Sequence, residues 1–499
     1  MAAIAFDNSY ARLPERFFSR RQPTPVADPG PVRVNHPLAT LLGIAPQWLE
    51  SPEGTAVLAG NAIAPGSEPI ATVYAGHQFG SYNPQLGDGR ALLLGEVIGA
   101  DGTRYDIQLK GSGPTPYSRG GDGRAPLGAV LREYIVSEAM HTLGLPTTRA
   151  LAAVTTGEQV ARESFLPGAV LCRVARSHIR IGTFQFFAAR RDTEALELLV
   201  AHVLERHYPD AAGDGNPALA LLQRMITAQA CLVARWQSLG FIHGVMNTDN
   251  MLLSGETIDY GPCAFMDAFN RDQVYSSIDH AGRYAFGNQP AITHWNLAAL
   301  AQALLPVLHP DQDQAVALAQ AAVDAFPGQF AREHGQCLAR KLGLAVLADG
   351  DQALADELFQ LMEEHQLDFT LTFRRLADLA GSTPGGDGAT PGAGTTVEAL
   401  FEVPDPLLPW LARWQQRLAA EQTTPGERQA VMYSANPVFI PRNHLVEEAL
   451  RAATEQGDFE PFNALVDVLS QPFAYNPERA RFATPPRPEQ VVRQTFCGT

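Results

Sequence analysis

The residues best suited to chemistry lie in two short stretches, HGVMNTDNMLL at residues 243–253 and IDYG at residues 258–261. Asn250 and Asp259 carry hard oxygen ligands of the kind that Mg²⁺ and Mn²⁺ prefer. Asp249 places a carboxylate next to Asn250, where it is a candidate proton acceptor. The two stretches therefore predict a divalent metal site with a base beside it.

The elements around these stretches follow the order seen in protein kinases: an amphipathic helix, a loop, a short strand and an Asp-x-Gly turn. The kinase loop H-R-D-x-x-x-x-N supplies a base and a metal ligand, and D-F-G supplies a second ligand. His243 and Asn250 keep the seven-residue separation of that loop, and Asp259 begins an Asp-Tyr-Gly turn. Val245 stands where the kinase base belongs, which leaves Asp249 as the nearby carboxylate.

A glycine-rich turn and a lysine precede these stretches. Gly87, Gly89 and Arg90 come directly before the aliphatic run ALLLGEV, so their backbone can form a tight turn that approaches a phosphate closely. A Gly-x-Gly between two strands is more often an ordinary hairpin, and both interpretations remain open. Lys110 ends the next apolar strand, YDIQLKG, where it must reach solvent or meet an anion.

The segment after Lys110 is rich in glycine and locally basic. It contains Arg119, Asp122, Gly123 and Arg124, as an insertion that closes over a triphosphate would. A helix is predicted over residues 127–143, with Glu138 on its apolar stripe and Glu133 to one side. Periodicity slightly favours Glu138 for burial. Both glutamates compete as partner for Lys110, and both could also be solvated.

Three arginines lie among apolar residues in VLCRVARSHIRIGTFQFF, residues 170–187. Guanidinium groups match phosphate oxygens bidentately, so Arg173, Arg176 and Arg180 suggest anion recognition. Arg173 and Arg180 are seven residues apart, which places them on opposite faces of a regular strand. If both touch one ligand, the strand must bend or end between them.

Several long motifs resemble the selenoprotein O family of pseudokinase-fold protein adenylyltransferases, in family order over most of the chain. They are GHQFGSYNPQLGDGRA, QLKGSGPTPYSRGGDGRAPL, LGLPTTRAL, HGVMNTDNM, DYGPCAFMD and ANPVFIPRNHLVEEAL. The resemblance implies an α+β, protein-kinase-like two-lobed fold. It has a β-rich N-lobe, a largely helical C-lobe and a C-terminal helical extension. It also implies that ATP binds in a flipped orientation and that AMP is transferred to Ser, Thr or Tyr hydroxyls of other proteins, with release of pyrophosphate.

The resemblance assigns roles to individual residues. Asp249 is the proton acceptor, Asn250 and Asp259 hold Mg²⁺ or Mn²⁺, and Glu133 is the partner of Lys110. The implied nucleotide site consists of Gly87, Gly89, Arg90, Lys110, Asp122, Gly123, Glu133, Arg173, Arg180 and Asp259. Two other functions remain open, a conventional kinase and a catalytically silent nucleotide-binding protein, and UTP is an alternative to ATP.

Composition and the resemblance together predict the organisation of the chain. We expect an N-terminal extension packing on the core at 1–70, an N-lobe with the glycine-rich and phosphate loops at 71–190, and a C-lobe with the catalytic and metal-binding loops at 191–380. A flexible Gly/Pro/Thr linker is predicted at 381–396, followed by C-terminal helices and a tail at 397–499. The apolar stripes of these helices belong either to the hydrophobic core or to a docking surface.

The tail carries Cys497, at the place where some family members have selenocysteine. Some members pair the tail with a cysteine in the loop after the Asp-Tyr-Gly turn, but here that loop reads QVYSSIDH and has none. The resemblance still implies protein substrates that are possibly redox-linked. The other four cysteines are scattered without a CxxC pair and predict neither a zinc site nor a disulfide framework.

Charge and hydropathy bound the remaining functions. A formal charge of -16 over 499 residues argues against nucleic acid as a partner, since phosphate neutralisation requires an excess of Lys and Arg. We identify no apolar run of the about 18 to 20 residues that a membrane helix requires, so no membrane association is expected. The amino terminus carries Asp7 and Glu15 and has no apolar signal region. We therefore expect a cytoplasmic protein.

Overall fold

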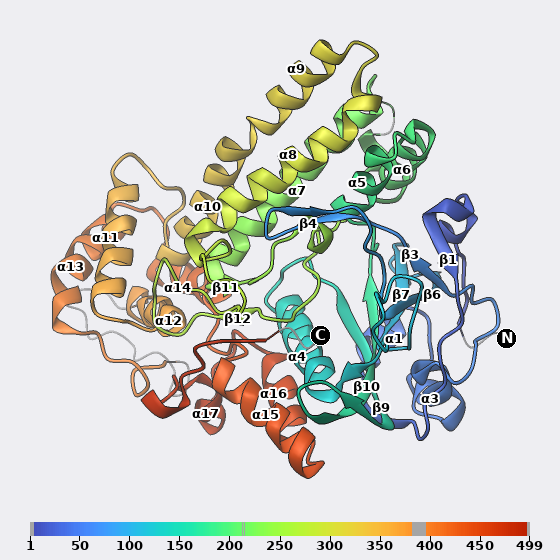
Figure 1. The fold of residues 1–499 in the computed structure, drawn as a ribbon. Coiled ribbons are helices and arrows are strands. Elements are labelled where there is room, and N and C mark those ends of the chain that lie inside the picture. Colours follow the sequence, from blue (N-terminus) through green and yellow to red (C-terminus); the bar gives the residue numbers. More distant parts are fainter. Residues whose placement is uncertain (1–3, 212, 214, 382–395, 497–499) are drawn as a thin grey trace.

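The computed structural model describes residues 4–211, 213, 215–381 and 396–496. Most of the linker predicted at 381–396 and Cys497 lie outside the described residues. The fold is mixed α+β, with an antiparallel sheet built from the N-terminal part of the chain and many helices contributed by the rest (Figure 1). The predicted α+β class is confirmed at this level.

The main sheet has eight strands in the order β1-β3-β6-β7-β10-β9-β2, with β8 paired to β10, and all its pairs are antiparallel. Its first two strands come from the segment before residue 70. The strands are β1 Phe18–Arg20, β2 Gly30–Val34, β3 Ile70–Thr72, β6 Ala91–Ile98, β7 Arg104–Lys110, β8 Ala125–Pro126, β9 Arg149–Ala161 and β10 Phe165–Ala175. Two small pairs stand apart, β4 Gly76–Gln78 with β5 Ser81–Asn83, and β11 Phe241–Ile242 with β12 Ala264–Phe265.

Alternate residues of β10 face two different layers. Val170, Cys172 and Val174 pack into the core formed with α1 His36–Leu41, α2 Pro46–Leu49 and α3 Pro52–Ala59. Leu171 packs on the other side, against α4 Leu127–Thr142. Because strand side chains alternate with a period of two, Arg173 lies on the same side as Leu171, facing α4. This register brings the arginine to the helix that carries Glu133.

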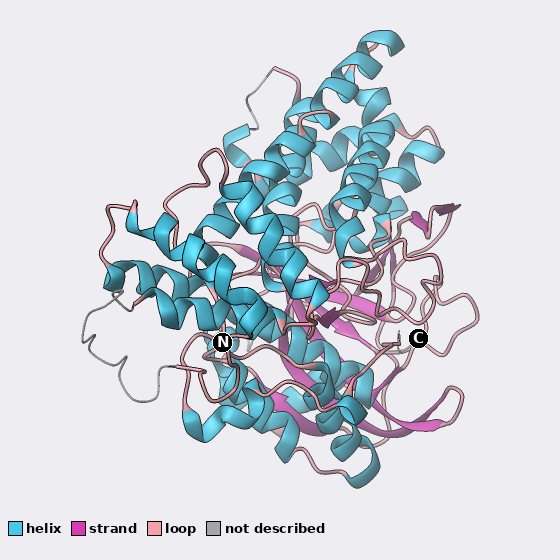
Figure 2. Ribbon diagram, turned by 90° about the vertical axis from the view of Figure 1, so that its left-hand side faces the viewer, coloured by secondary structure: helices cyan, strands magenta, loops and turns pink. Residues whose placement is uncertain are grey.

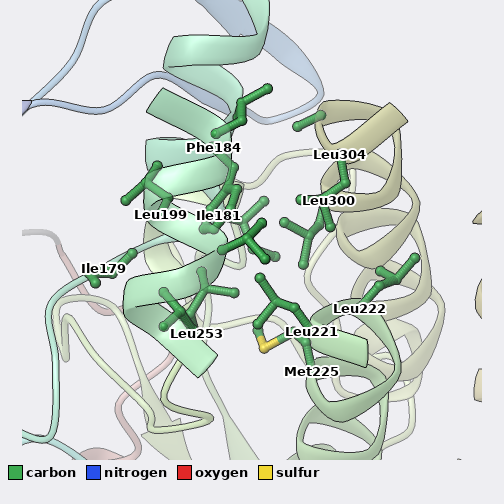
Figure 3. Packing of buried hydrophobic residues seen from close by; sticks show 14 of the residues in the cluster. Ile179, Ile181, Phe184, Leu199, Leu221, Leu222, Met225, Leu253, Leu300 and Leu304 are labelled. Carbon is green, nitrogen blue, oxygen red and sulfur yellow. The ribbon is translucent and has the colours of Figure 1, made fainter. Parts of the chain in front are cut away.

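A second core joins the helices that follow the sheet (Figure 3). Ile181 and Phe184 of α5 pack there with Leu221 and Met225 of α7 and with Leu300 of α8, as the close-up shows. The helices of this part are α5 Ile181–Ala189, α6 Thr193–His207, α7 Pro217–Leu239, α8 Gln289–Leu308, α9 Gln312–Val323 and α10 Phe326–Leu342.

Helix α7 ends just before the loop that carries the predicted catalytic and metal-binding residues. The Asn216 side chain caps its first turn by accepting a hydrogen bond from the Leu219 backbone. Gly240 ends it in the left-handed region, with a φ of 69°, a conformation that glycine adopts without steric cost. The chain then enters β11 and the loop that begins at His243.

The C-terminal helices lie at the left and at the bottom of Figure 1, and Figure 2 shows the fold turned by 90° with helices and strands in different colours. Tyr134 of α4 meets Phe462 of α16 with ring centroids 5.5 Å apart. Arg442, which is fully buried just before α15, binds Asp368 and Asp267 at 2.8 and 2.7 Å. The apolar stripes of α15 and α16 are thus part of a core shared with α4. The helices are α11 Asp351–Glu364, α12 Phe369–Ala380, α13 Leu408–Ala419, α14 Pro425–Ala435, α15 Asn443–Gln456, α16 Glu460–Leu469 and α17 Ala480–Ala483.

The described tail lies against the loop that follows β12. Thr495 forms a parallel bridge with Ser276, and its hydroxyl donates to the Pro262 carbonyl at 2.6 Å. The loop QVYSSIDH and the end of the chain are therefore neighbours. Of the four cysteines in the described part, Cys172 and Cys263 are buried, while the other two are partly exposed.

Two helical stretches, Pro217–Leu239 and Phe286–Leu308, are long and apolar enough to cross a membrane by length and composition alone. The sequence analysis expected no such stretch. Within their most apolar windows, 61% and 50% of the residues are buried inside the protein, and core helices of soluble proteins meet the same criterion. Their packing in the core of Figure 3 accounts for their apolar composition without a membrane.

We predict that Leu221→Ala lowers the free energy of unfolding by about 2 to 5 kcal/mol, because a fully buried side chain is replaced by a cavity. Urea denaturation followed by circular dichroism measures the change. Val316→Ala on α9 is the matched control, since Val316 is 46% exposed and its truncation is expected to change the free energy by less than about 0.5 kcal/mol. Equal effects of the two substitutions would contradict the packing in Figure 3.

Candidate active site

Lys110, at the end of β7, makes two ion pairs. Its Nζ lies 2.6 Å from Oε2 of Glu133 on α4 and 3.0 Å from Oδ1 of Asp259. Glu138 is bound elsewhere, by Arg149 at 2.7 Å and by the Asn35 side chain at 2.7 Å. Glu133 is therefore the partner of Lys110, and the periodicity argument that favoured Glu138 for burial is wrong. The reason is that α4 is covered on both sides, by the sheet and by α15 and α16.

Arg173 and Arg180 meet at the same carboxylate despite their seven-residue separation. Arg173 Nη1 lies 2.7 Å from Asp259 Oδ1 and 3.0 Å from Glu133 Oε1, and Arg180 Nη1 lies 2.7 Å from Asp259 Oδ2. Strand β10 ends at Ala175, and the chain turns before Arg180 caps the start of α5. The strand thus ends between the two arginines, as their convergence requires. Arg176 instead interacts through its backbone N–H with Glu256.

Asp259 is the centre of this ion cluster, which we define as Lys110, Glu133, Arg173, Arg180 and Asp259. Burial favours the neutral acid, but the charges of Lys110, Arg180 and Arg173 outweigh it and hold the pKa of Asp259 well below its usual range. The Asp259 backbone has a φ of 63°, a left-handed conformation that is uncommon for residues other than glycine. The surrounding cations hold the carboxylate ionised in this position.

Asp249 lies in the short 3₁₀ helix Thr248–Asn250 and is almost completely buried. Its Oδ2 accepts a hydrogen bond from Gln78 Nε2 at 3.0 Å, and its Oδ1 has no hydrogen-bond partner among the described residues. Burial raises the pKa of Asp249 to about 6, against the hydrogen bond from Gln78 and the charge of Arg180, which lower it. Asp249 is therefore a carboxylate with one free oxygen and a pKa suited to proton transfer near neutral pH.

The β4–β5 hairpin holds the loop that carries Asp249. The backbone N–H of His77 donates to Thr248 Oγ1 at 2.7 Å, and that of Phe79 donates to Asn247 Oδ1 at 3.0 Å. A Cβ on Gly76 would lie 2.4 Å from Asp249 Oδ1, so only glycine leaves room for the carboxylate. The sequence analysis missed Gln78, although the stretch GHQFG that contains it was among the motifs quoted for the resemblance.

His243 connects the two predicted stretches. It is buried, its Nε2 lies 2.9 Å from the Ile258 carbonyl, and its Nδ1 accepts a hydrogen bond from the Val245 backbone. Because Ile258 directly precedes Asp259, this bond fixes the loop of Asn250 against the turn of Asp259. His243 and Val245 therefore support the loop through hydrogen bonds. The carboxylate that stands next to Asn250 in this loop is that of Asp249.

The oxygens of Asn250 and Asp259 fit a divalent cation of the hard type. The Asn250 amide donates to the Val245 carbonyl at 3.0 Å, which leaves its oxygen as an acceptor. A carboxylate has about four acceptor positions, of which the cations Lys110, Arg173 and Arg180 use three at Asp259. Among the described residues no group of three or more His, Cys, Asp or Glu side chains could hold a metal. A cation here would depend on water and phosphate for its remaining ligands, as Mg²⁺ commonly does.

The glycines predicted for the nucleotide site are packed under the loop that follows Lys110. A Cβ on Gly87, whose φ is 142°, would lie 2.4 Å from the Tyr117 ring, and one on Gly89 would lie 2.9 Å from the Tyr117 carbonyl. Thr115 Oγ1 donates to the Asp88 carbonyl at 2.7 Å. The turn and the loop thus form one folded unit, and the backbone carbonyl of Arg90 accepts from Gly111 in the same region.

Asp122 and Gly123 lie at the far end of that loop. Asp122 forms an ion pair with Arg162 at 2.9 Å, and Gly123, with a φ of 66°, packs against the Gly113 backbone. Their contacts tie the loop to itself and to the end of β9. The structure therefore brings Lys110, Glu133, Arg173 and Arg180 together. Asp122 and Gly123 make their contacts outside this cluster.

Comparison with known proteins identifies the family to which the chain belongs. The family model described as "Protein adenylyltransferase SelO" matches residues 1–470. The chain belongs to the SelO family. It is 59% identical over 494 residues to a protein of Bradyrhizobium sp. (strain ORS 278) named "Protein nucleotidyltransferase YdiU", and the alignment covers 99% of each chain. A Methylorubrum populi protein of the same name is 58% identical over 498 residues, with 100% of both chains covered.

Membership of the SelO family confirms the resemblance inferred from the sequence motifs. The alignments cover 99% and 100% of the two relatives, so they span the C-terminal helices as well as the segments that carry the ion cluster. The chain is therefore an enzyme of the nucleotidyltransferase class, a protein nucleotidyltransferase of the SelO family.

We predict that Gln78→Leu raises the pKa of Asp249 by about one unit, because the substitution removes a hydrogen bond to the ionised carboxylate. Carboxyl ¹³C NMR of protein labelled at aspartate, with Asp249→Asn for assignment, measures the pKa. Gln223→Leu on the exposed side of α7 is the control and is expected to leave that pKa at about 6. An unchanged pKa in Gln78→Leu would show that the amide does not stabilise the charged form.

Proposed function

We propose that this protein transfers AMP from ATP to Ser, Thr or Tyr hydroxyls of other proteins and releases pyrophosphate. The observation that carries the proposal is that two carboxylates, those of Asp259 and Asp249, have opposite electrostatic environments. Asp259 is kept ionised by three cations, while Asp249 has a raised pKa and a free oxygen. The first suits charge neutralisation around phosphates, and the second suits proton transfer. The SelO and YdiU relatives are named for this class of reaction.

In this proposal Asn250 and Asp259 hold Mg²⁺ or Mn²⁺. The cation would supply positive charge between the phosphate oxygens when bound. Lys110, Arg173 and Arg180 bind the Asp259 carboxylate and bring further positive charge to the same place. ATP phosphates bound here would be flanked by cations, which offset charge on the departing pyrophosphate.

Asp249 takes the proton in the transfer step. The target hydroxyl donates its proton to the Asp249 carboxylate, the hydroxyl oxygen forms a bond to the α-phosphorus, and the bond between the α-phosphorus and the bridging oxygen of pyrophosphate breaks. A carboxylate with an ordinary pKa would be a weak base for a hydroxyl. Burial offsets part of this weakness by raising the pKa of Asp249 to about 6.

Gly87, Gly89, Arg90, Asp122 and Gly123 are assigned to the nucleotide site in the same proposal. Their support is their position on the turn that precedes β6 and on the loop that follows β7, since the start of β6 at Ala91 pairs with Lys110 at the end of β7. Thr115 and Ser118 fasten the loop to the turn through the carbonyls of Asp88 and Gly89. A phosphate bound at Lys110 would then be covered by this folded unit.

The proposal includes a kinase-like, two-lobed organisation with boundaries near residues 70, 190 and 380. Its support is the ion pair from strand β7 to helix α4 together with the metal-type residues on the loops after α7, which is the kinase arrangement of parts. We further propose that the protein acts in the cytoplasm on other proteins, redox-linked proteins among them, and not on nucleic acid or membranes.

A conventional kinase is the second candidate, since the pairing of Lys110 and Glu133 is also the one that kinases use. The two reactions differ in which phosphate is transferred, and a silent nucleotide-binding protein would transfer neither. UTP in place of ATP would give uridylylation at the same site.

We predict that protein incubated with Mn²⁺ or Mg²⁺ transfers radiolabel to a protein acceptor from ATP labelled at the α-phosphate and not from ATP labelled at the γ-phosphate. Asp259→Ala is expected to abolish transfer, because it removes the carboxylate around which the cations and the proposed metal are arranged. Asp313→Ala on the exposed face of α9 removes the same charge far from the cluster and is expected to leave transfer intact. Transfer of the γ label would favour the kinase alternative.

The raised pKa of Asp249 gives a pH dependence. Asp249 must be ionised to accept a proton, so kcat/KM is expected to fall as the pH falls through about 6 and to level off above it. Asp249→Asn should reduce kcat by a factor of about 10² to 10⁴ and remove this dependence. A profile of kcat/KM against pH measures both, and an acidic limb near the ordinary carboxyl pKa of about 4 would contradict the role of burial.

A further inference from the structure

An exposed aromatic surface lies beside Asp249. Tyr82 of β5 and Trp295 of α8 are 40% and 38% exposed, which is high for large aromatic side chains. The His77 ring lies between them, with centroids 4.9 Å from Tyr82 and 5.1 Å from Trp295. Three rings, two from the β4–β5 hairpin and one from α8, thus form one continuous surface.

Two arginines flank this surface. Arg283 lies over the Trp295 ring at 5.0 Å and over the Tyr284 ring at 5.7 Å. On the other side, Arg190 lies over the Phe186 ring at 3.5 Å, next to Tyr82. Among the residues that the structure describes, neither guanidinium is in an ion pair with a carboxylate. Arg190 Nη1 instead donates to the Pro84 and Phe186 carbonyls at 3.2 and 3.0 Å, and Arg283 Nε has no hydrogen-bond partner within the described part of the chain. We call Tyr82, His77, Trp295, Arg190 and Arg283 the basic aromatic surface.

An acidic side chain of the same loop, Asp279, is already used within the fold. Both Asp279 oxygens accept backbone hydrogen bonds, from Arg283 at 2.9 Å and from Tyr284 at 2.7 Å. Two arginines without carboxylate partners thus lie on one face of a chain whose formal charge is -16. Guanidinium groups held by aromatic rings remain free to bind carboxylates.

The surface is fastened directly to the proposed base. Gln78, between His77 and Phe79 in the hairpin, donates to Asp249, and a Cβ on Gly80 would lie 3.6 Å from Arg283 Cζ. Tyr284 OH also donates to Asn247 Oδ1 at 2.6 Å, in the loop that leads to Asp249. The hairpin therefore contacts Asp249 through Gln78 and Arg283 through Gly80, two residues further along the chain.

We propose that the basic aromatic surface binds the protein substrate and selects segments with an acidic residue within about two to four positions of the target hydroxyl. This inference rests on the proposed transfer to protein hydroxyls and adds the substrate class. Tyr82 and Trp295 contact the segment through their rings, and Arg283 pairs with its carboxylate. Charge complementarity between an unpaired arginine and an acidic segment gives the specificity.

The test uses two synthetic peptides that differ only at the positions flanking one serine, with Glu in one and Gln in the other. For the wild-type protein, kcat/KM for α-label transfer is expected to be about ten times higher with the Glu peptide, as one charge-assisted hydrogen-bonded pair would give. Arg283→Gln should bring that ratio close to one, because it lowers kcat/KM for the Glu peptide more than for the Gln peptide. Arg451→Glu, at an exposed position of α15, which lies below β4 in Figure 1, should keep the wild-type ratio.

A second measurement separates this inference from the proposed function. Fluorescence anisotropy of labelled peptide measures binding without any transfer. Tighter binding of the Glu peptide that is lost in Arg283→Gln supports the surface even if no label is transferred, in which case the proposed function alone fails. Transfer with equal kcat/KM and equal binding for the two peptides overturns the surface and leaves the proposed function intact.

A second copy of this chain is the other occupant to test. Sedimentation equilibrium of the full-length protein should give a monomer mass that Trp295→Ala does not change. A dimer that dissociates in Trp295→Ala would make this face a self-interface and overturn the proposal.

Discussion

The carboxylate of Asp259 is the point on which the site depends. Three cations from three separate elements bind it: Lys110 from the end of β7, Arg173 from β10 and Arg180 from the start of α5. Without Asp259, Arg173 and Arg180 would be nearly buried charges close to each other. Removing one partner of a buried ion pair leaves an uncompensated charge, which is strongly destabilising. The Asp259 carboxylate thus stabilises the packing of the sheet against the helical part of the chain, and it stabilises the site as well.

Asp249 owes its properties to a different element, the β4–β5 hairpin. The hairpin covers residues 247–250 with two backbone hydrogen bonds and supplies one amide hydrogen bond to the carboxylate. Burial outweighs the charge of Arg180 and raises the pKa of Asp249, whereas the charges of three cations outweigh burial and lower the pKa of Asp259. One fold therefore shifts the pKa values of two aspartates in opposite directions. The aromatic rings of the same hairpin continue outward as the basic aromatic surface.

Local pattern predicted the parts of the site that belong to one stretch of chain. The spacing of His243 and Asn250, the Asp-Tyr-Gly turn and a lysine in an apolar strand are visible in the sequence, and the structure brings Lys110 and Asp259 together. Periodicity failed at Glu133, because α4 is packed on both faces and a single apolar stripe does not identify its buried side. Gln78 was missed because it lies 171 residues from Asp249 and its strand is only three residues long. Contacts of that kind depend on tertiary packing, which no local window contains.

The central claim is that the nucleotide binds with its α-phosphate between the ion cluster and Asp249. A crystal structure of the protein with Mn²⁺ and a non-hydrolysable ATP analogue tests it directly, since the anomalous signal of Mn²⁺ locates the cation without ambiguity. The account predicts a manganese peak between Asn250 Oδ1 and Asp259, with the α-phosphate as the phosphate nearest to Asp249. A nucleotide with its γ-phosphate nearest to Asp249, or bound away from Lys110 and Asp259, would contradict it.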